Sequence, residues 1–122
     1  MKIREAIAQV DESLANVCTQ KNKISWLNQL DHRVKTKIID THEGREKVRF
    51  DGYDAETDTE TELLVYAPYD EMYLRWLEAK IYYANQEEAR YNNAMDLFEA
   101  LWAEFRNDYN RTHIPLGSRL KF

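Results

Sequence analysis

The chain has 122 residues, of which 43% are hydrophobic and 32% are charged, and its formal net charge is −5 at pH 7. This composition predicts a single globular domain, and the shortage of Lys and Arg argues against general affinity for nucleic acids. No apolar run approaches the roughly 20 residues of a membrane span or forms the core of a signal peptide, so we expect a soluble protein with no membrane partner. Cys18 is the single cysteine, which fits a reducing compartment.

Two amphipathic helices are predicted in the first part of the chain. The first apolar stripe consists of Ile3, Ala6, Ile7 and Val10. It predicts a short helix that frays near 11–13. The second stripe consists of Ile24, Leu27, Leu30, Val34 and Ile38. Thr19 or Asn22 is suited to cap the start of this longer helix, and Gly44 is expected to form its left-handed C-terminal cap.

The segment 44–67 changes character. Val48 and Phe50 alternate with polar residues, and residues 63–65 form a short apolar run before Pro68. We therefore predict two short strands that flank an acidic loop, as a hairpin inserted between the second and third helices. Pro68 is predicted to be the first residue of the third helix, where its missing N–H costs nothing.

Two wide aromatic-rich stripes, at 69–84 and 91–109, predict the third and fourth helices. Lys80 alone interrupts the first stripe, and the two stripes bury best against each other and the second helix. The predicted fold class is mainly α: a small four-helix bundle-like domain over residues 1–113, with the short β-hairpin and acidic loop inserted. A C-terminal arm at 114–122 follows.

Charge is strongly segregated along the chain. Residues 1–50 carry a net +3 and residues 51–122 a net −8, with eight carboxylates and no Lys or Arg between Asp51 and Glu71. The candidate partner-binding residues of this acidic loop are Asp54, Glu56, Asp58, Glu60 and Glu62. The loop is interpreted in three ways: as a solvated segment, as a docking surface for a basic partner, or as a calcium site.

The spacing of possible ligands disfavours a metal site. Counting Asp54 as the first calcium position puts Thr59 where the turn glycine belongs and Val65 where the bidentate glutamate belongs. His42 and the following Glu lack the second histidine of the helical zinc-protease motif, and no other His–Cys spacing suits zinc. We expect no metal and no cofactor.

Catalytic signatures are also missing from the sequence. It contains no nucleophile elbow, Walker loop or dinucleotide fingerprint, so we expect no enzymatic activity. Most aromatic residues fall on the predicted inner stripes, which favours core packing over base stacking. Tyr66, Tyr82 and Tyr83 are poorly explained by one core face and are candidates for subunit contacts.

The C-terminal arm combines apolar and basic side chains in a stretch too short to fold alone. The candidate partner-binding residues in and beside it are Arg111, Leu116, Arg119, Leu120, Lys121 and Phe122. The arm is interpreted either as terminal disorder or as a segment that orders on a neighbouring subunit or partner.

Several short motifs together suggest a family. They are Trp26-Leu-x-x-Leu-Asp31, Thr41-His-Glu-Gly44, Phe50-x-Gly-Tyr53, Asp58-Thr-x-Thr-Glu-Leu-Leu-Val65, Pro68-Tyr-Asp-Glu-x-Tyr73, Ala79-Lys-Ile81, Ala89-Arg-Tyr-Asn-Asn93 and Tyr109-Asn-Arg-Thr-His113. From about residue 20 to 113 the chain resembles the head-tail connector, or adaptor, proteins of tailed phages and prophages of Gram-positive bacteria. None of these motifs is a chemical signature.

The resemblance implies a non-enzymatic virion protein that self-associates into a ring, expected to be a dodecamer, beneath the portal. It implies two further partners, the portal protein and a tail-completion or stopper protein, and DNA that passes through without specific binding. The expected location is the virion, and the host cytoplasm during assembly. The alternative is a small prophage-encoded regulatory or inhibitor protein whose acidic loop binds a basic partner surface.

Overall fold

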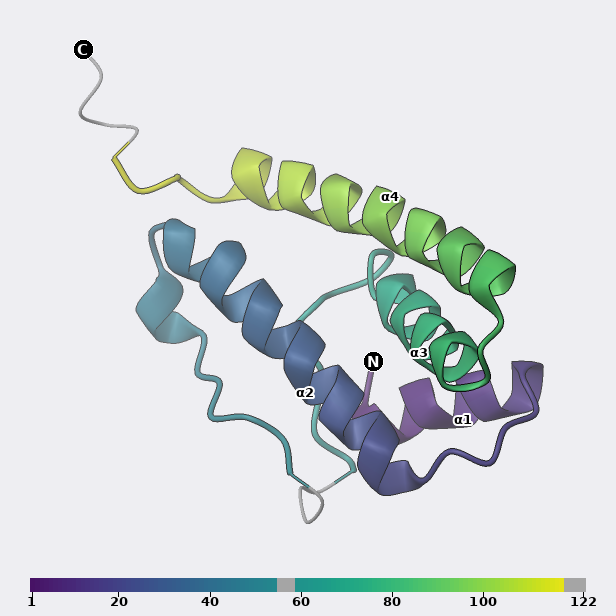
Figure 1. The fold of residues 1–122 in the computed structure, drawn as a ribbon. Helices are drawn as coiled ribbons and strands as arrows, with labels where there is room; N and C mark the ends of the chain where they lie inside the picture. The colour runs from purple at the N-terminus through teal and green to yellow at the C-terminus, as the bar shows by residue number, and fades with distance from the viewer. Residues whose placement is uncertain (55–58, 118–122) are drawn as a thin grey trace.

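The structure is a computed structural model, and it describes residues 1–54 and 59–117. Its elements are α1 (Ile3–Ser13), α2 (Gln20–Lys37), the short 3-10 helices η1 (Ile39–Thr41) and η2 (Arg45–Lys47), α3 (Glu71–Ala84) and α4 (Glu88–Thr112). The central helix is α3, which packs against α1, α2 and α4 (Figure 1). The mainly helical class predicted from the apolar stripes is confirmed.

The first two helices form where the periodicity predicts them. Every member of both apolar stripes is buried, and α1 ends at Ser13, inside the segment expected to fray. The side chain of Thr19 caps α2, because its Oγ1 accepts a hydrogen bond from the Asn22 backbone N–H at 3.1 Å. The start of α2 is therefore set by a local capping interaction as well as by burial.

The predicted β-hairpin is wrong. Within residues 1–54 and 59–117 the only β-type pairs are two isolated bridges, one between Lys2 and Glu62 and one between His42 and Pro115. The apolar segment 63–65 is held elsewhere: the Leu63 N–H donates to the Met1 carbonyl at 2.9 Å. Side chains of α2 and α3 accept the next two backbone N–H groups of the segment. Backbone groups satisfied in this way are not available for strand pairing.

Two boundary predictions also need correction. Gly44 adopts the left-handed conformation, with φ of 84°, but it precedes η2, whereas α2 ends at Lys37. Pro68 is not the first residue of α3, because the segment before Glu71 forms turns in which the Tyr69 N–H donates to the Tyr66 carbonyl. The chain therefore turns once more at 66–70 before the central helix begins.

The third and fourth helices are joined by a tight turn at 85–87, with Gln86 in the left-handed region at φ of 59°. Ala94, Phe98, Phe105 and Tyr109 anchor α4 in the core. Figure 1 shows α2 and α4 diverging from one end of the molecule, with α3 between them. Among the described helices, none combines the length and apolarity needed to cross a membrane.

The described part of the C-terminal arm, 114–117, is attached to the domain. The Glu43 N–H donates to the Ile114 carbonyl at 2.8 Å, and the Leu116 N–H donates to the Thr41 carbonyl at 2.9 Å. These two bonds bracket the bridge between His42 and Pro115. The arm therefore leaves the domain beside the end of α2.

Candidate functional site

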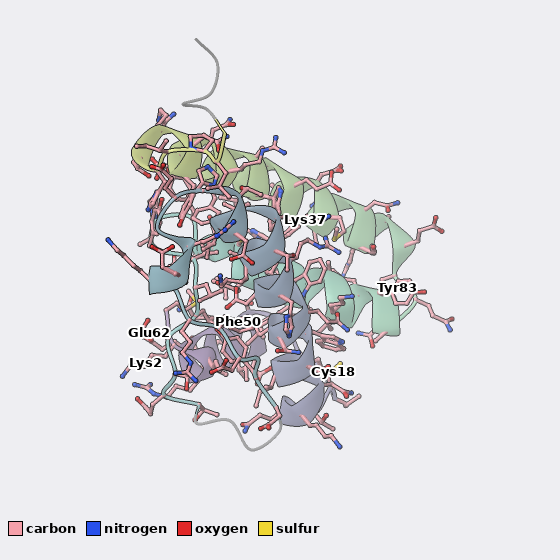
Figure 2. All side chains as sticks on the ribbon, turned by 90° about the vertical axis from the view of Figure 1, so that its left-hand side faces the viewer. Lys2, Cys18, Lys37, Phe50, Glu62 and Tyr83 are labelled. Atoms are coloured by element: carbon pink, nitrogen blue, oxygen red, sulfur yellow. The ribbon has the colours of Figure 1, made fainter. Side chains whose placement is uncertain are left out.

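The acidic loop is tied back onto the start of α1. Glu60 receives hydrogen bonds from Lys2 Nζ at 2.8 Å and from Arg4 Nε at 2.5 Å, and these contacts lower the pKa of its carboxyl group. The Met1 ammonium lies 3.1 Å from Glu62 Oε2. Figure 2 shows Lys2 and Glu62 at the same edge of the molecule. Part of the predicted acidic surface is thus neutralised within the chain.

The other predicted partner-binding residues are dispersed. Asp54 and Leu116 are exposed, and the exposed Arg111 pairs with Asp108 at 3.1 Å. Glu56, Asp58, Arg119, Leu120, Lys121 and Phe122 lie outside the described residues. Across residues 1–54 and 59–117, no group of three or more His, Cys, Asp or Glu side chains is placed to hold a metal ion. Among the candidates that the structure describes, Glu60 and Glu62 contact the start of α1, whereas Arg111 lies at the end of α4 and pairs there with Asp108.

A buried carboxylate lies at the centre of the fold. Asp31 has no exposed surface, and its two oxygens accept hydrogen bonds from Tyr73 Oη at 2.6 Å, Tyr53 Oη at 2.7 Å and the Leu64 N–H at 3.1 Å. Burial raises the pKa of Asp31, and the three hydrogen bonds act in the opposite direction. The carboxylate of Asp31 in α2 thus connects Tyr73 of α3 with Tyr53 and Leu64. Because it has no exposed surface, a substrate could not reach it.

A second buried polar group connects the end of α2 to α4. His42 is 2% exposed; its Nδ1 donates to the Ile38 carbonyl at 2.7 Å, and its Nε2 lies 2.6 Å from Asn110 Oδ1. Its ring packs edge-on against Tyr109, with centroids 4.8 Å apart. Both ring nitrogens are therefore engaged, and His42 is a structural connection at the base of the arm.

The clearest surface feature is a basic groove, a name we use for the hollow above α3 between α2 and α4. It has a volume of about 460 Å³ and is lined by Arg33, Trp76, Ala79, Lys80, Tyr83, Tyr91 and Met95. Trp76 forms its floor and is only 5% exposed. The Arg33 guanidinium carbon lies 5.3 Å from the centroid of the Trp76 ring, and Lys80 Nζ lies 4.7 Å from it.

Two cations thus share one indole ring. In the part of the chain that the structure describes, neither Arg33 nor Lys80 forms an ion pair or a hydrogen bond. Desolvation, and secondly the charge of Arg33, lower the pKa of Lys80. Contact with the face of Trp76 offsets part of this repulsion. The basic groove is therefore an uncompensated positive surface that favours an anionic group.

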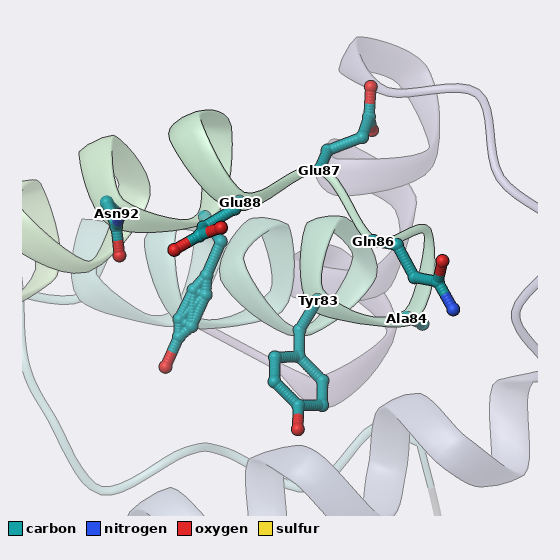
Figure 3. A pocket seen from close by; sticks show the side chains of 7 residues that line it. Tyr83, Ala84, Gln86, Glu87, Glu88 and Asn92 are labelled. Atoms are coloured by element: carbon teal, nitrogen blue, oxygen red, sulfur yellow. The ribbon is translucent and has the colours of Figure 1, made fainter.

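An aromatic pair extends the basic groove toward the α3–α4 turn. Tyr83 is 73% exposed, and its ring lies 5.6 Å from that of Tyr91. Figure 3 shows the adjoining hollow, in which Tyr83 projects from α3 while Glu87 points away on the opposite side. Glu88 lines this adjoining hollow but not the part beside Arg33. The positive end and the acidic end of the surface are separated by the tyrosines.

Comparisons with protein-family models, with curated protein sequences and with solved structures find no match to this chain. Its function must therefore be inferred from its own residues.

Sequence reasoning missed the basic groove but contained a signal for it. Lys80 is the single charged residue in the apolar stripe of the third helix. The ammonium group of a lysine at such a position must extend to solvent, which indicates an opening in the surface there. Tyr83 was marked by the pattern as unexplained by the core, and its exposure agrees with that. Arg33 gave no signal, because its place beside Trp76 depends on how α2 and α3 cross.

The coupling between the two cations gives a testable prediction. Replacing Arg33 by Gln removes the neighbouring charge, so the pKa of Lys80 is expected to rise toward its usual value while desolvation keeps it below that value. An NMR titration of the Lys80 side chain measures this shift. Lys47→Gln is the control, because Lys47 lies on η2 and should leave Lys80 unchanged. An identical Lys80 titration in Arg33→Gln would contradict the coupling.

Proposed function

We propose that this protein is a non-enzymatic structural adaptor of a tailed phage or prophage. It forms a ring beneath the portal and links the portal to tail-completion proteins during virion assembly, in the host cytoplasm and then in the virion. Its resemblance to connector proteins from about residue 20 to 113 supports the proposal. DNA passes through the ring without specific binding, as the acid excess of the chain favours.

The distribution of polar groups also supports a structural role. Within the described residues, no buried side-chain nitrogen or oxygen lacks a hydrogen-bond partner, and the two central polar groups, Asp31 and His42, are closed to solvent. The polar groups without ion pairs lie on open surfaces such as the basic groove. This distribution is suited to holding other macromolecules in place, whereas catalysis requires reactive groups that a substrate can reach.

The arm provides the proposed contact with the portal. Ile114 is 41% exposed and Leu116 is 46% exposed, although the backbone there is fixed to residues 41–43. Apolar side chains presented by a fixed backbone lose little conformational entropy when a partner covers them. The base of the arm is therefore already ordered for docking.

Deletion of residues 117–122 tests this contact. The domain is expected to keep its thermal unfolding midpoint, because the backbone bonds of the arm end at Leu116. Capture by the portal protein encoded in the same genome should be strongly weakened, since the deletion removes the predicted partner-binding residues Arg119, Leu120, Lys121 and Phe122 while Ile114 and Leu116 remain. Capture is measured with purified, tagged portal, and the full chain is the reference.

Two results would contradict the proposal. One is failure of the full chain to bind the portal under any assembly condition. The other is a gene position away from portal and capsid genes. Binding that survives the deletion unchanged would instead show that residues 117–122 are not the contact, and would leave the adaptor function in place.

The alternative, an inhibitor whose acidic loop occupies a basic surface, predicts binding through Glu60 and Glu62. These side chains contact Lys2, Arg4 and the Met1 ammonium, so a partner would first have to displace internal cations. That competition makes the loop a weaker docking surface than its charge suggests, and we therefore favour the adaptor.

A further inference from the structure

The described part of the chain has two exposed surfaces of opposite charge whose charged groups form no internal ion pairs. The first is the basic groove, with Arg33 and Lys80 at its centre. The second we call the acidic face of α4, formed by Asp96 and Glu99, both exposed and three positions apart. They lie on the side of α4 away from the buried Phe98.

We propose that the basic groove of one copy binds the acidic face of α4 of a second copy. This inference rests on the proposed function, because the contact would form the subunit interface of the proposed ring. The occupant is thus a second copy of this chain, bound through the carboxylates of Asp96 and Glu99.

These two surfaces each bring together two charges of the same sign that are unpaired in the described part of the chain. Many other charges of the described chain pair with each other: Lys2 and Arg4 with Glu60, Lys23 with Asp11, Lys35 with Asp40, Arg75 with Glu71 and Glu78, and Arg90 with Glu87. Among the described residues, single exposed charges such as Lys47 and Glu104 also lack an ion pair, but Arg33 and Lys80 share one indole ring in a hollow. Asp96 and Glu99 likewise lie close together, one turn apart on one helix face. Joining the two pairs across an interface would compensate four charges that the monomer leaves exposed.

The geometry of the basic groove suits a helix as its occupant. The basic groove lies over one helix, α3, and between two diverging ones, α2 and α4 (Figure 1). The exposed ring of Tyr83 adds apolar surface at its end, and tyrosine is enriched at protein interfaces. Glu88 lies beyond Tyr83, so an incoming acidic helix is directed to the Arg33 and Lys80 end.

The contact is heterologous, because one copy contributes the basic groove and the other contributes the acidic face. Each bound copy therefore still offers one free surface of each kind. Repetition of such a contact produces a closed ring if the rotation between copies closes, and an open filament if it does not. A two-fold dimer, in contrast, would use the same surface on both copies.

The first experiment identifies the touching residues. Equal amounts of ¹⁵N-labelled and unlabelled full chain are treated with a zero-length carbodiimide at low salt, free and on purified portal. A mixed-isotope peptide that joins Lys80 to Asp96 or Glu99 is the expected product. The free protein is taken to about 1 mM, where a contact with a millimolar Kd is half formed. The absence of this peptide in both samples would overturn the proposal.

The second experiment uses complementary variants. Arg33→Gln with Lys80→Gln disables the basic groove, and Asp96→Lys with Glu99→Lys disables the exposed acidic face. Each variant alone should self-associate at least about tenfold more weakly than the wild-type chain, as measured by sedimentation equilibrium. A mixture of the two should form a one-to-one complex and nothing larger, because each variant retains only one working surface.

Two control variants test whether the loss of association is specific to the two surfaces. Lys47→Gln and Glu104→Lys change exposed charges outside both surfaces and should leave association unchanged. Unchanged association in the groove and α4 variants would overturn the inference, while portal capture by the same variants would leave the proposed function standing. Binding of a labelled single-stranded oligonucleotide that needs Arg33 and Lys80, without self-association, would assign the basic groove to nucleic acid instead.

Discussion

Replacing Asp31 by Ala is expected to lower the free energy of unfolding by about 3 to 5 kcal/mol, because three buried donors lose their acceptor and each costs about 1 to 3 kcal/mol. Those donors are the hydroxyl groups of Tyr53 and Tyr73 and the backbone N–H of Leu64. Urea unfolding followed by tryptophan fluorescence measures the loss. Asp51→Ala is the matched control, since Asp51 forms an exposed pair with Arg49 and should cost no more than about 0.5 kcal/mol. A loss below about 1 kcal/mol for Asp31→Ala would contradict the network.

The pH dependence of Asp31 has a definite sign. Burial raises its pKa in the folded state above the unfolded value, so folded molecules bind this proton more tightly. The stability that this group contributes is therefore fully present below the unfolded pKa and is lost as the pH rises through the raised folded pKa. The unfolding free energy of the wild-type chain minus that of Asp31→Asn should therefore fall as the pH rises through that range. A difference that rises with pH would show that the hydrogen bonds outweigh burial.

This network also explains where Tyr53 and the segment 63–65 lie. The Tyr53 N–H donates to Asn28 Oδ1 at 2.7 Å, and the Val65 N–H donates to Tyr73 Oη at 2.8 Å. Together with the bonds to Asp31, these contacts hold both ends of the acidic loop against α2 and α3. The chain on either side of the acidic loop is thus held by core side chains.

The helices could be predicted because each carries its signal locally. An apolar side chain every three or four residues specifies a buried face, and a residue such as Thr19 specifies the start of a helix by its own hydrogen bond. The stripe at 91–109 predicted α4 for this reason, and its members Phe98, Phe105 and Tyr109 are buried. The predicted hairpin was wrong because strand pairing depends on contacts between residues that are distant in sequence. Segment 63–65 has strand-like composition, yet its backbone bonds go to side chains distant in sequence.

The basic groove required the same kind of non-local information. Arg33 and Lys80 are 47 positions apart, and only the packing of α2 on α3 brings both to Trp76. The charge of the acidic loop is obvious from the sequence, but its internal partners are not. Lys2 and Arg4, which pair with Glu60, lie 58 and 56 positions earlier in the chain. Charge counts thus identified the acidic segment but gave no indication that Glu60 and Glu62 have internal partners.

The position of the acidic face depends on how firmly α4 is anchored, and Phe105 is the strongest single anchor to test. It is 1% exposed. The centroid of its ring lies 5.3 Å from that of Tyr66, 6.0 Å from that of Tyr69 and 5.8 Å from that of Tyr109. Phe105→Ala is expected to lower the free energy of unfolding by about 3 to 5 kcal/mol, because it removes a buried ring and leaves a cavity. Urea unfolding measures the loss.

Leu97→Ala is the control within the same helix. Leu97 is 42% exposed, so the same kind of truncation should change the free energy of unfolding by no more than about 0.5 kcal/mol. Because Phe105 joins α4 to the turn before α3, its loss should also speed amide hydrogen exchange in α4 around Asp96 and Glu99, while Leu97→Ala leaves that exchange unchanged. Equal effects of the two substitutions would mean that α4 is not anchored through Phe105. The acidic face would then lack the fixed position that binding to the basic groove of a second copy requires.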